Sequence, residues 1–129
     1  MNSIVLVDDH DIYRSNLKLN LKDLNIVGEA VDYPSALELI ERVKPDLVIL
    51  GFSQAFDGNV SIISDIISRH PSVKILVLTI YDWSGYATAA LARGAAGYCL
   101  KYEAIDEINR AISAVLRGER YISPHLTDY

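Results

Sequence analysis

Polar side chains stand where apolar segments of the chain end, and their types suit phosphoryl chemistry. Asp8 and Asp9 follow the first apolar run, Thr79 ends the fourth, and Lys101 follows the fifth. Two adjacent carboxylates are hard oxygen ligands suited to Mg²⁺, and a hydroxyl and an ammonium nearby could hold a phosphoryl oxygen and neutralise developing charge. The third run ends in Gly51, so the central segment supplies no nucleophile to this set.

Apolar runs alternate with segments in which apolar residues recur at helical spacing, so each of these residues follows an expected strand. We expect strands over 3–7, 26–31, 47–50, 74–78 and 97–100, and helices around 17–24, 34–43, 62–67, 86–91 and 105–115. This order forces right-handed crossovers and an α/β fold, a five-stranded doubly wound parallel sheet with helices on both faces. Polar sites in such a sheet gather at the carboxyl ends of the strands.

Length and composition describe one ordinary globular domain of 129 residues, of which 50% are hydrophobic and 22% are charged. The single cysteine, Cys99, excludes an internal disulfide framework, and its apolar neighbours favour a small buried side chain. The net charge of −5 disfavours direct contact with DNA, which selects clustered Lys and Arg. No stretch approaches the ~20 apolar residues that span a bilayer, so we expect a cytoplasmic domain without a membrane partner.

Each polar residue also has an ordinary structural explanation. An Asp-Asp pair after a strand is often only the N-cap of the next helix. Thr79 alone would more often be a strand-end residue, and Lys101 alone would usually be solvated. Together, at the ends of the first, fourth and fifth strands, these residues are far more specific than any one of them.

The sequence around these positions resembles the receiver domains of two-component response regulators, from Ile4 to about Pro124. The subtype most similar in pattern is the LuxR or NarL type, which precedes a helix-turn-helix domain. The resemblance is carried by VLVDDH (5–10), VGEA (27–30), PDLVIL (45–50), VLT (77–79), GAAGY (94–98) and GERYISP (118–124). It implies a flavodoxin-like (βα)5 fold, in which an aspartate on the third strand takes a phosphoryl group from a histidine kinase with Mg²⁺.

The resemblance also implies a role for individual residues. Asp8 and Asp9 match the metal-binding acidic pair of the family. Thr79 matches the hydroxyl residue that follows the phosphoryl group, and Lys101 matches the lysine that pairs with the aspartyl phosphate. Tyr98 falls on the aromatic position whose rotamer reports the active state.

Gly51 falls on the phosphoacceptor, and there the sequence departs from the family. Glycine can be neither nucleophile nor metal ligand, so an aspartyl phosphate cannot form at this position. The loop 52–58 lacks the family's Met-Pro turn, which argues against a single substitution in an otherwise working receiver. We expect Mg²⁺ to bind weakly at Asp8 and Asp9, because one of three carboxylates is lost. We also expect Lys101 to pair with Asp8 or Asp9 instead.

Another residue could take over as phosphoacceptor, and Asp57 is the first candidate. An acid directly before Gly58 is also ordinary turn chemistry. Ser53 is a hydroxyl without an evident base. His10, beside the acidic pair, is expected to begin a helix rather than to carry a phosphoryl group.

We expect residues 1–118 to form the receiver domain and residues 119–129 to begin a linker toward a helix-turn-helix domain. A natural C-terminus at this point is equally compatible with the sequence. DNA would be bound only through that further domain, which this chain lacks. Protein partners, including a second copy in a dimer, are expected on the face of the fourth helix, fifth strand and fifth helix, or on the first and fifth helices. Trp83 would be an anchor there if it is exposed, and core packing is the alternative.

Two classes of function remain. The first is a regulatory module, not an enzyme, that controls a transcriptional output through dimerisation, protein binding or a ligand other than phosphate. The second is a Mg²⁺-dependent phosphatase of the haloacid-dehalogenase type, which residues 9–11, Thr79 and Lys101 loosely resemble. Such an enzyme needs a further acidic motif, for which Glu103 and Asp106 are poor substitutes, so the receiver interpretation explains more residues.

Overall fold

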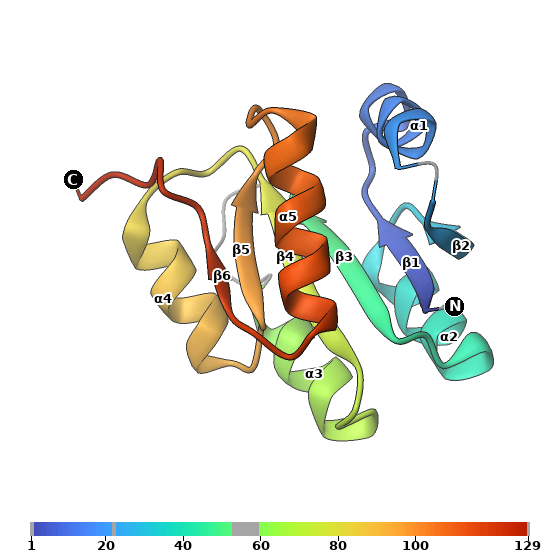
Figure 1. The fold of residues 1–129 in the computed structure, drawn as a ribbon. Helices are drawn as coiled ribbons and strands as arrows, with labels where there is room; N and C mark the ends of the chain where they lie inside the picture. The colour runs from blue at the N-terminus through green and yellow to red at the C-terminus, as the bar shows by residue number, and fades with distance from the viewer. Residues whose placement is uncertain (1, 22, 53–59, 129) are drawn as a thin grey trace.

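The computed structural model describes residues 2–21, 23–52 and 60–128, in which strands and helices alternate along the chain (Figure 1). The strands are β1 (Ser3–Val7), β2 (Asn25–Ala30), β3 (Leu47–Phe52), β4 (Lys74–Thr79), β5 (Gly97–Leu100) and β6 (Tyr121–Ile122). The helices are α1 (Asp11–Asn20), α2 (Tyr33–Val43), α3 (Ser61–Arg69), α4 (Ser84–Ala92) and α5 (Ile105–Leu116).

The strands form one sheet in the order β2-β1-β3-β4-β5-β6, and every neighbouring pair is parallel. The predicted α/β fold class is therefore confirmed. The chain moves outward from β1 in both directions, so the strand order reverses between β1 and β3. Polar sites of open parallel sheets form at such a switch point, outside the carboxyl ends of the strands.

Alternating side chains divide the core into two layers, one on each face of the sheet. In β1, Val5 and Val7 belong to the layer that includes buried residues of α2, α3 and α4. Ile4 and Leu6 belong to the layer that includes residues of α1 and α5. Strands that are buried on both faces have continuous apolar sequences, and the apolar runs therefore predicted their positions well.

The ends of the elements are set by local chemistry. The carboxylate of Asp32 accepts a hydrogen bond from the backbone N–H of Ser35, 2.8 Å away, and so caps α2. Gly94, with a φ of 113°, makes the turn from α4 toward β5 in a conformation that favours glycine. No helix in the described ranges is long and apolar enough to cross a membrane.

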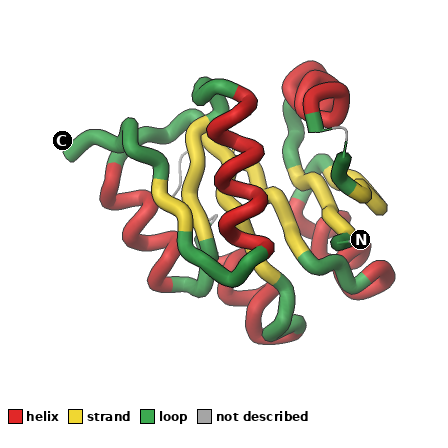
Figure 2. The backbone as a smooth tube through the Cα atoms, in the orientation of Figure 1, coloured by secondary structure: helices red, strands yellow, loops and turns green. Residues whose placement is uncertain are grey.

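The sheet differs from the prediction at both of its edges. The second strand begins and ends one residue earlier than expected, and Val31 is exposed. The C-terminal segment, which we expected to begin a linker, adds the short strand β6 beside β5 (Figure 2). A strand of two residues is too short to produce a recognisable sequence pattern, so this strand is revealed by its pairing with Gly97 and Tyr98.

Candidate functional site

The parallel sheet brings the predicted polar residues to one edge. The turn after β1 supplies Asp8 and Asp9, β4 ends in Thr79, and Lys101 directly follows β5. The backbone N–H of Lys101 donates to the carbonyl oxygen of Thr79 at 2.8 Å, which fixes the end of β5 against β4. Gly51 lies in β3, between the ends of β1 and β4 in the strand order.

A buried ion pair joins β1 to β5 at the centre of this edge. The ammonium Nζ of Lys101 lies 2.7 Å from Oδ2 of Asp8, and the two side chains are only 6% and 9% exposed. The other carboxylate oxygen, Oδ1, accepts the backbone N–H of His10 at 2.9 Å. The Lys101 ammonium also lies 4.6 Å from the centre of the Tyr13 ring, a cation–π contact. The expectation that Lys101 pairs with one of the two aspartates is confirmed, and the partner is Asp8.

Gly51 makes room for this pair. A Cβ atom at position 51 would lie 2.5 Å from Oδ2 and 2.9 Å from Cγ of Asp8, and 3.1 Å from the carbonyl oxygen of Val7. Real Cβ atoms essentially never approach other atoms more closely than 3.0 Å. The Asp8 carboxylate therefore lies where a side chain at position 51 would begin.

Asp8, Asp9 and His10 are the described residues that could hold a metal ion, since one ligand atom from each lies within 4.8 Å of the others. Nδ1 of His10 is 3.6 Å from Oδ1 of Asp8 and 3.8 Å from Oδ1 of Asp9. Mg²⁺ prefers an octahedron of oxygen ligands. Both oxygens of Asp8 already accept hydrogen bonds, one from the Lys101 ammonium. The site therefore fits Mg²⁺ poorly as it stands.

Thr79 and Tyr98 are both tied to the loop between β4 and α4. The Thr79 hydroxyl oxygen accepts the backbone N–H of Tyr81 at 3.2 Å, and the Tyr98 hydroxyl donates to the Tyr81 carbonyl oxygen at 2.7 Å. Thr79 and Tyr98 are fully buried. Burial raises the pKa of the Tyr98 hydroxyl, so it remains a hydrogen-bond donor across the physiological range.

Two residues of α1 that the sequence did not single out complete the surroundings of the pair. Arg14 donates from Nη1 to the carbonyl oxygen of Asp8 at 2.6 Å and from Nε to Glu29 at 2.7 Å, which holds the turn after β1 in place. The Tyr13 ring covers the Lys101 ammonium. Both lie one helical turn or less from Asp11, but no motif distinguishes them from surface residues.

His10 is the N-cap of α1, as expected, and its Nδ1 lies 3.3 Å from the Lys101 ammonium. Other predicted residues lie apart from the pair. Glu103 does not face the Asp8 site: its carboxylate accepts hydrogen bonds from Ser123 and Cys99. Cys99 is fully buried, as expected from its apolar neighbours. The candidate substitutes Asp57 and Ser53 lie outside the described residues.

Comparison with known proteins assigns this chain to a family. The sequence pattern of the response regulator receiver domain matches residues 4–113. The chain belongs to the response regulator receiver family. This finding confirms the resemblance noted in the sequence, and the relatives of the receiver domain are transcriptional and response regulators.

The receiver domain is 35% identical over 127 residues to the transcriptional regulatory protein DegU of Brevibacillus brevis, a match that covers 96% of this chain and 54% of DegU. It is 32% identical over 129 residues to the response regulator GacA of Pseudomonas aeruginosa, with 98% and 60% covered. The chain thus spans little more than half the length of these relatives.

Solved structures agree with the family assignment. The domain superposes with a TM-score of 0.89 on a LuxR-family two-component response regulator from Aurantimonas sp. SI85-9A1, at 31% identity, and the match covers 96% of this chain and 91% of that one. The isolated REC domain of RcsB from Salmonella enterica serovar Typhimurium has the same fold, with a TM-score of 0.86 at 23% identity over 97% and 95% of the two chains.

Proposed function

We propose that this receiver domain controls a transcriptional output without an aspartyl phosphate at the end of β3. By resemblance to the family, Gly51 occupies the phosphoacceptor position, and glycine offers no carboxylate. The observation that carries the proposal is the lack of space for a side chain at Gly51, where a Cβ would lie 2.5 Å from the carboxylate of Asp8. The space in which an acceptor side chain would begin is filled by a different acid.

The Asp8–Lys101 pair supports a domain whose conformation is held without phosphorylation. In the family, the lysine equivalent to Lys101 pairs with the aspartyl phosphate. Here its ammonium is neutralised by Asp8 at 2.7 Å, in a nearly buried position. The switch residues Thr79 and Tyr98 both bond to Tyr81, which supports one held conformation of the β4–α4 loop.

Weak binding of Mg²⁺ is part of the same proposal. Receiver domains in general bind Mg²⁺ at the acidic site. Asp8 and Asp9 would be its ligands here, but Asp8 must first give up the Lys101 ammonium. A cation that has to compete with a buried lysine binds less tightly than one that enters an acidic site lacking such a pair.

The proposal of a transcriptional output comes from relatives that are longer than this chain. DegU and GacA, of which the chain covers 54% and 60%, are named as a transcriptional regulator and a response regulator. We therefore propose that residues 1–118 are the receiver, that residues 119–129 lead toward a DNA-binding domain, and that the protein works in the cytoplasm.

Two apolar surfaces are candidates for the protein partner or the second copy. On the α4 side, Trp83 is 41% exposed and its ring packs edge-on against Tyr86, 5.1 Å between centres. On the α1 side, Ile12, Ile80 and Tyr102 are exposed beside a groove of about 440 Å³ that Lys101 also lines. The free edge of β5 is covered by β6, so we favour the α1 side, which leads directly to the Asp8–Lys101 pair.

The test is to offer the domain a phosphoryl donor. We would treat it with acetyl phosphate or beryllofluoride, with and without Mg²⁺, and record the intact mass and the fluorescence of Trp83, the only tryptophan. We expect no adduct and no change in fluorescence. A receiver domain that carries an aspartate at the equivalent position serves as the positive control for the donor.

A stable phosphoryl adduct would overturn the proposal. The adduct would then be located by peptide mass spectrometry, with Asp57 examined first and Asp57→Asn as the confirming variant. Turnover of a generic phosphomonoester with Mg²⁺ would instead support the phosphatase alternative. We expect no turnover, since Glu103 is turned toward the C-terminal segment.

A further inference from the structure

The C-terminal segment, residues 121–128, runs along β5 and reaches the start of α4 (Figures 1 and 2). Beyond the β5–β6 pairing, the backbone N–H of Ser123 donates to the carbonyl oxygen of Tyr98 at 2.9 Å. Farther on, the N–H of Thr127 donates to Asp82 at 2.8 Å, and the Thr127 carbonyl accepts the N–H of Ser84 at 2.9 Å. The segment is thus attached at both ends, to β5 and to the β4–α4 loop.

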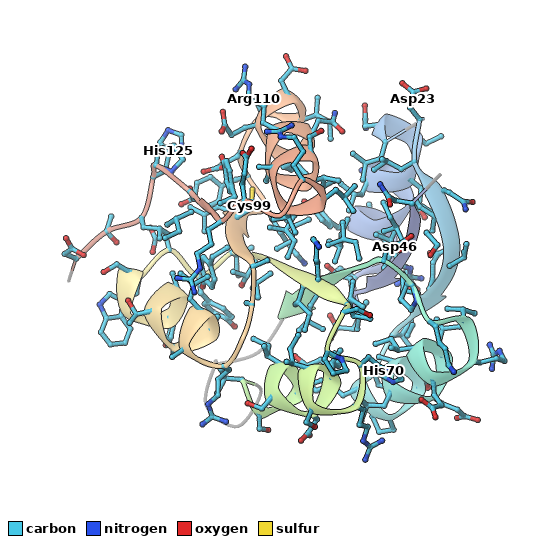
Figure 3. The ribbon with its side chains drawn as sticks, turned by 60° about the horizontal axis from the view of Figure 1, so that its bottom comes forward. Asp23, Asp46, His70, Cys99, Arg110 and His125 are labelled. Carbon is cyan, nitrogen blue, oxygen red and sulfur yellow. The ribbon has the colours of Figure 1, made fainter. Side chains whose placement is uncertain are left out.

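Between these two attachments lies a buried carboxylate. The Glu103 side chain is only 1% exposed. Its Oε1 accepts the hydroxyl of Ser123 and lies 3.0 Å from Nδ1 of His125, while its Oε2 accepts the thiol of Cys99 at 3.3 Å. The Ser123 hydroxyl oxygen in turn accepts the backbone N–H of His125 at 3.1 Å. Cys99 and His125 are labelled in Figure 3, on β5 and on the C-terminal segment.

The position of these partners matters because a buried carboxylate needs them. A charge removed from water is costly unless it is paired and hydrogen-bonded. In the part of the chain that the structure describes, the basic side chain beside Glu103 is the imidazole of His125, which is 63% exposed. If the C-terminal segment left the surface, the described residue that still donates to Glu103 would be Cys99, through its weak thiol donor.

We propose that residues 121–128 are a strap that Glu103 holds closed across β5 and onto the first turn of α4. When the strap is closed, β6 covers the edge of β5. When it opens, the N–H and C=O groups of β5 that pair with β6 become available to another extended segment. Tyr98 links the strap to the β4–α4 loop. Its carbonyl oxygen accepts the backbone N–H of Ser123, and its hydroxyl donates to the carbonyl oxygen of Tyr81. This proposal is independent of whether the domain is phosphorylated.

The test measures how firmly the strap is held. Amide hydrogen exchange, read by NMR on the full chain, would follow the N–H groups of Ser123 and Thr127, and Trp83 fluorescence would follow the far end, where Trp83 and Thr127 are bridged. In Glu103→Ala we expect exchange at both amides to rise about tenfold or more relative to wild type. Amides of β1 and β3 should keep their protection.

A second variant acts from the other side and leaves the Glu103 carboxylate in place. Ser123→Ala combined with His125→Ala should raise exchange at Thr127 and alter Trp83 fluorescence in the same way. Glu41→Gln is the matched control, since Glu41 pairs with His70 at the same 3.0 Å distance but away from the strap. It should change none of these signals.

Unchanged protection of Ser123 and Thr127 in both strap variants would overturn the proposal. So would loss of protection throughout the sheet in the Ser123→Ala and His125→Ala double variant, because the segment would then be part of the core rather than a separate strap. Selective loss at 123 and 127 supports the strap.

Discussion

Asp8 and Glu103 are two acids at one end of the sheet, each 8% exposed when the whole residue is counted, yet their partners differ. Asp8 faces Lys101, which is itself nearly buried and directly follows β5. Glu103, two residues beyond Lys101, faces Ser123 and the largely exposed His125 of the C-terminal segment. The difference lies in where the partner is anchored.

A partner on a core strand ties a buried acid to the fold as a whole, so the pair can separate only if the sheet is disturbed. A partner on a peripheral segment ties the acid to an element that can open by itself. We therefore expect the Asp8–Lys101 pair to stay together as long as the sheet is folded, and the Glu103 contacts to break and re-form while the rest of the domain stays folded. The predictions below test this contrast, from the largest expected effect to the smallest.

The largest effect is expected from Lys101→Met, which keeps the length of the side chain but leaves the Asp8 carboxylate buried and unpaired. Removing one partner of a buried ion pair costs about 3–5 kcal/mol. We expect a loss of that size in the free energy of unfolding, measured by urea denaturation.

Lys18→Met is the matched control for Lys101→Met. Lys18 pairs with Glu29 at the same 2.7 Å distance, but the two side chains are 41% and 31% exposed. Exposed pairs contribute roughly 0–1 kcal/mol, so this variant should remain close to wild type. Equal losses in the two variants would show that burial does not distinguish the Asp8 pair.

The second effect is expected from Gly51→Ala. The added Cβ would lie 2.5 Å from the Asp8 carboxylate, so Asp8 has to move away from its position beside Lys101. Crowding of this kind in a packed interior costs about 1–3 kcal/mol.

The Gly51→Ala variant also changes what Lys101→Met does. If the two substitutions act on one contact, their costs should not add, and the double variant should lose less than the sum. Additive losses would mean that Asp8 keeps its pair with Lys101 despite the alanine.

The sequence predicted the Asp8–Lys101 site well, because the polar residues follow continuous apolar runs and parallel strands align their ends. It left open which aspartate would meet Lys101. Packing decided that question, since Asp8 is buried beside Gly51 while Asp9 is exposed.

The Glu103 contacts could not be predicted in the same way. Ser123 and His125 lie 20 and 22 residues away, across all of α5. The strand that carries the segment past β5 has only two residues, which is too short for any periodicity. From the sequence alone, Glu103 was only a poor substitute for a phosphatase acid.

Magnesium tests the contrast at the Asp8 site. The wild-type domain should show no saturating NMR shifts around Asp8 and Asp9 at millimolar Mg²⁺. In Lys101→Ala the Asp8 carboxylate is released from its ammonium partner, so shifts at both aspartates should appear at lower Mg²⁺ concentration. Tight binding by the wild type would show that Lys101 does not block the cation.

The smallest effect concerns acid pH at the strap. The Tyr121 hydroxyl of β6 donates to Glu107 and is the main cause that lowers the pKa of this carboxyl below its ordinary 4.5, with Arg110 contributing. A carboxyl with a lowered pKa in the folded state stabilises that state above its ordinary value, and the contribution is lost as the pH falls through the lowered one.

Amide exchange at Ser123, compared between neutral pH and pH values below about 4 after correction for the intrinsic rate, should therefore show the strap loosening in acid. Glu107→Gln removes the titrating group and should make this loosening disappear, while the pairing of β1 with β3 stays protected in both proteins. Acid loosening of equal size in Glu107→Gln would assign the effect to another group. The contrast with the Asp8–Lys101 pair would then rest on Glu103 and its partners and not on Glu107.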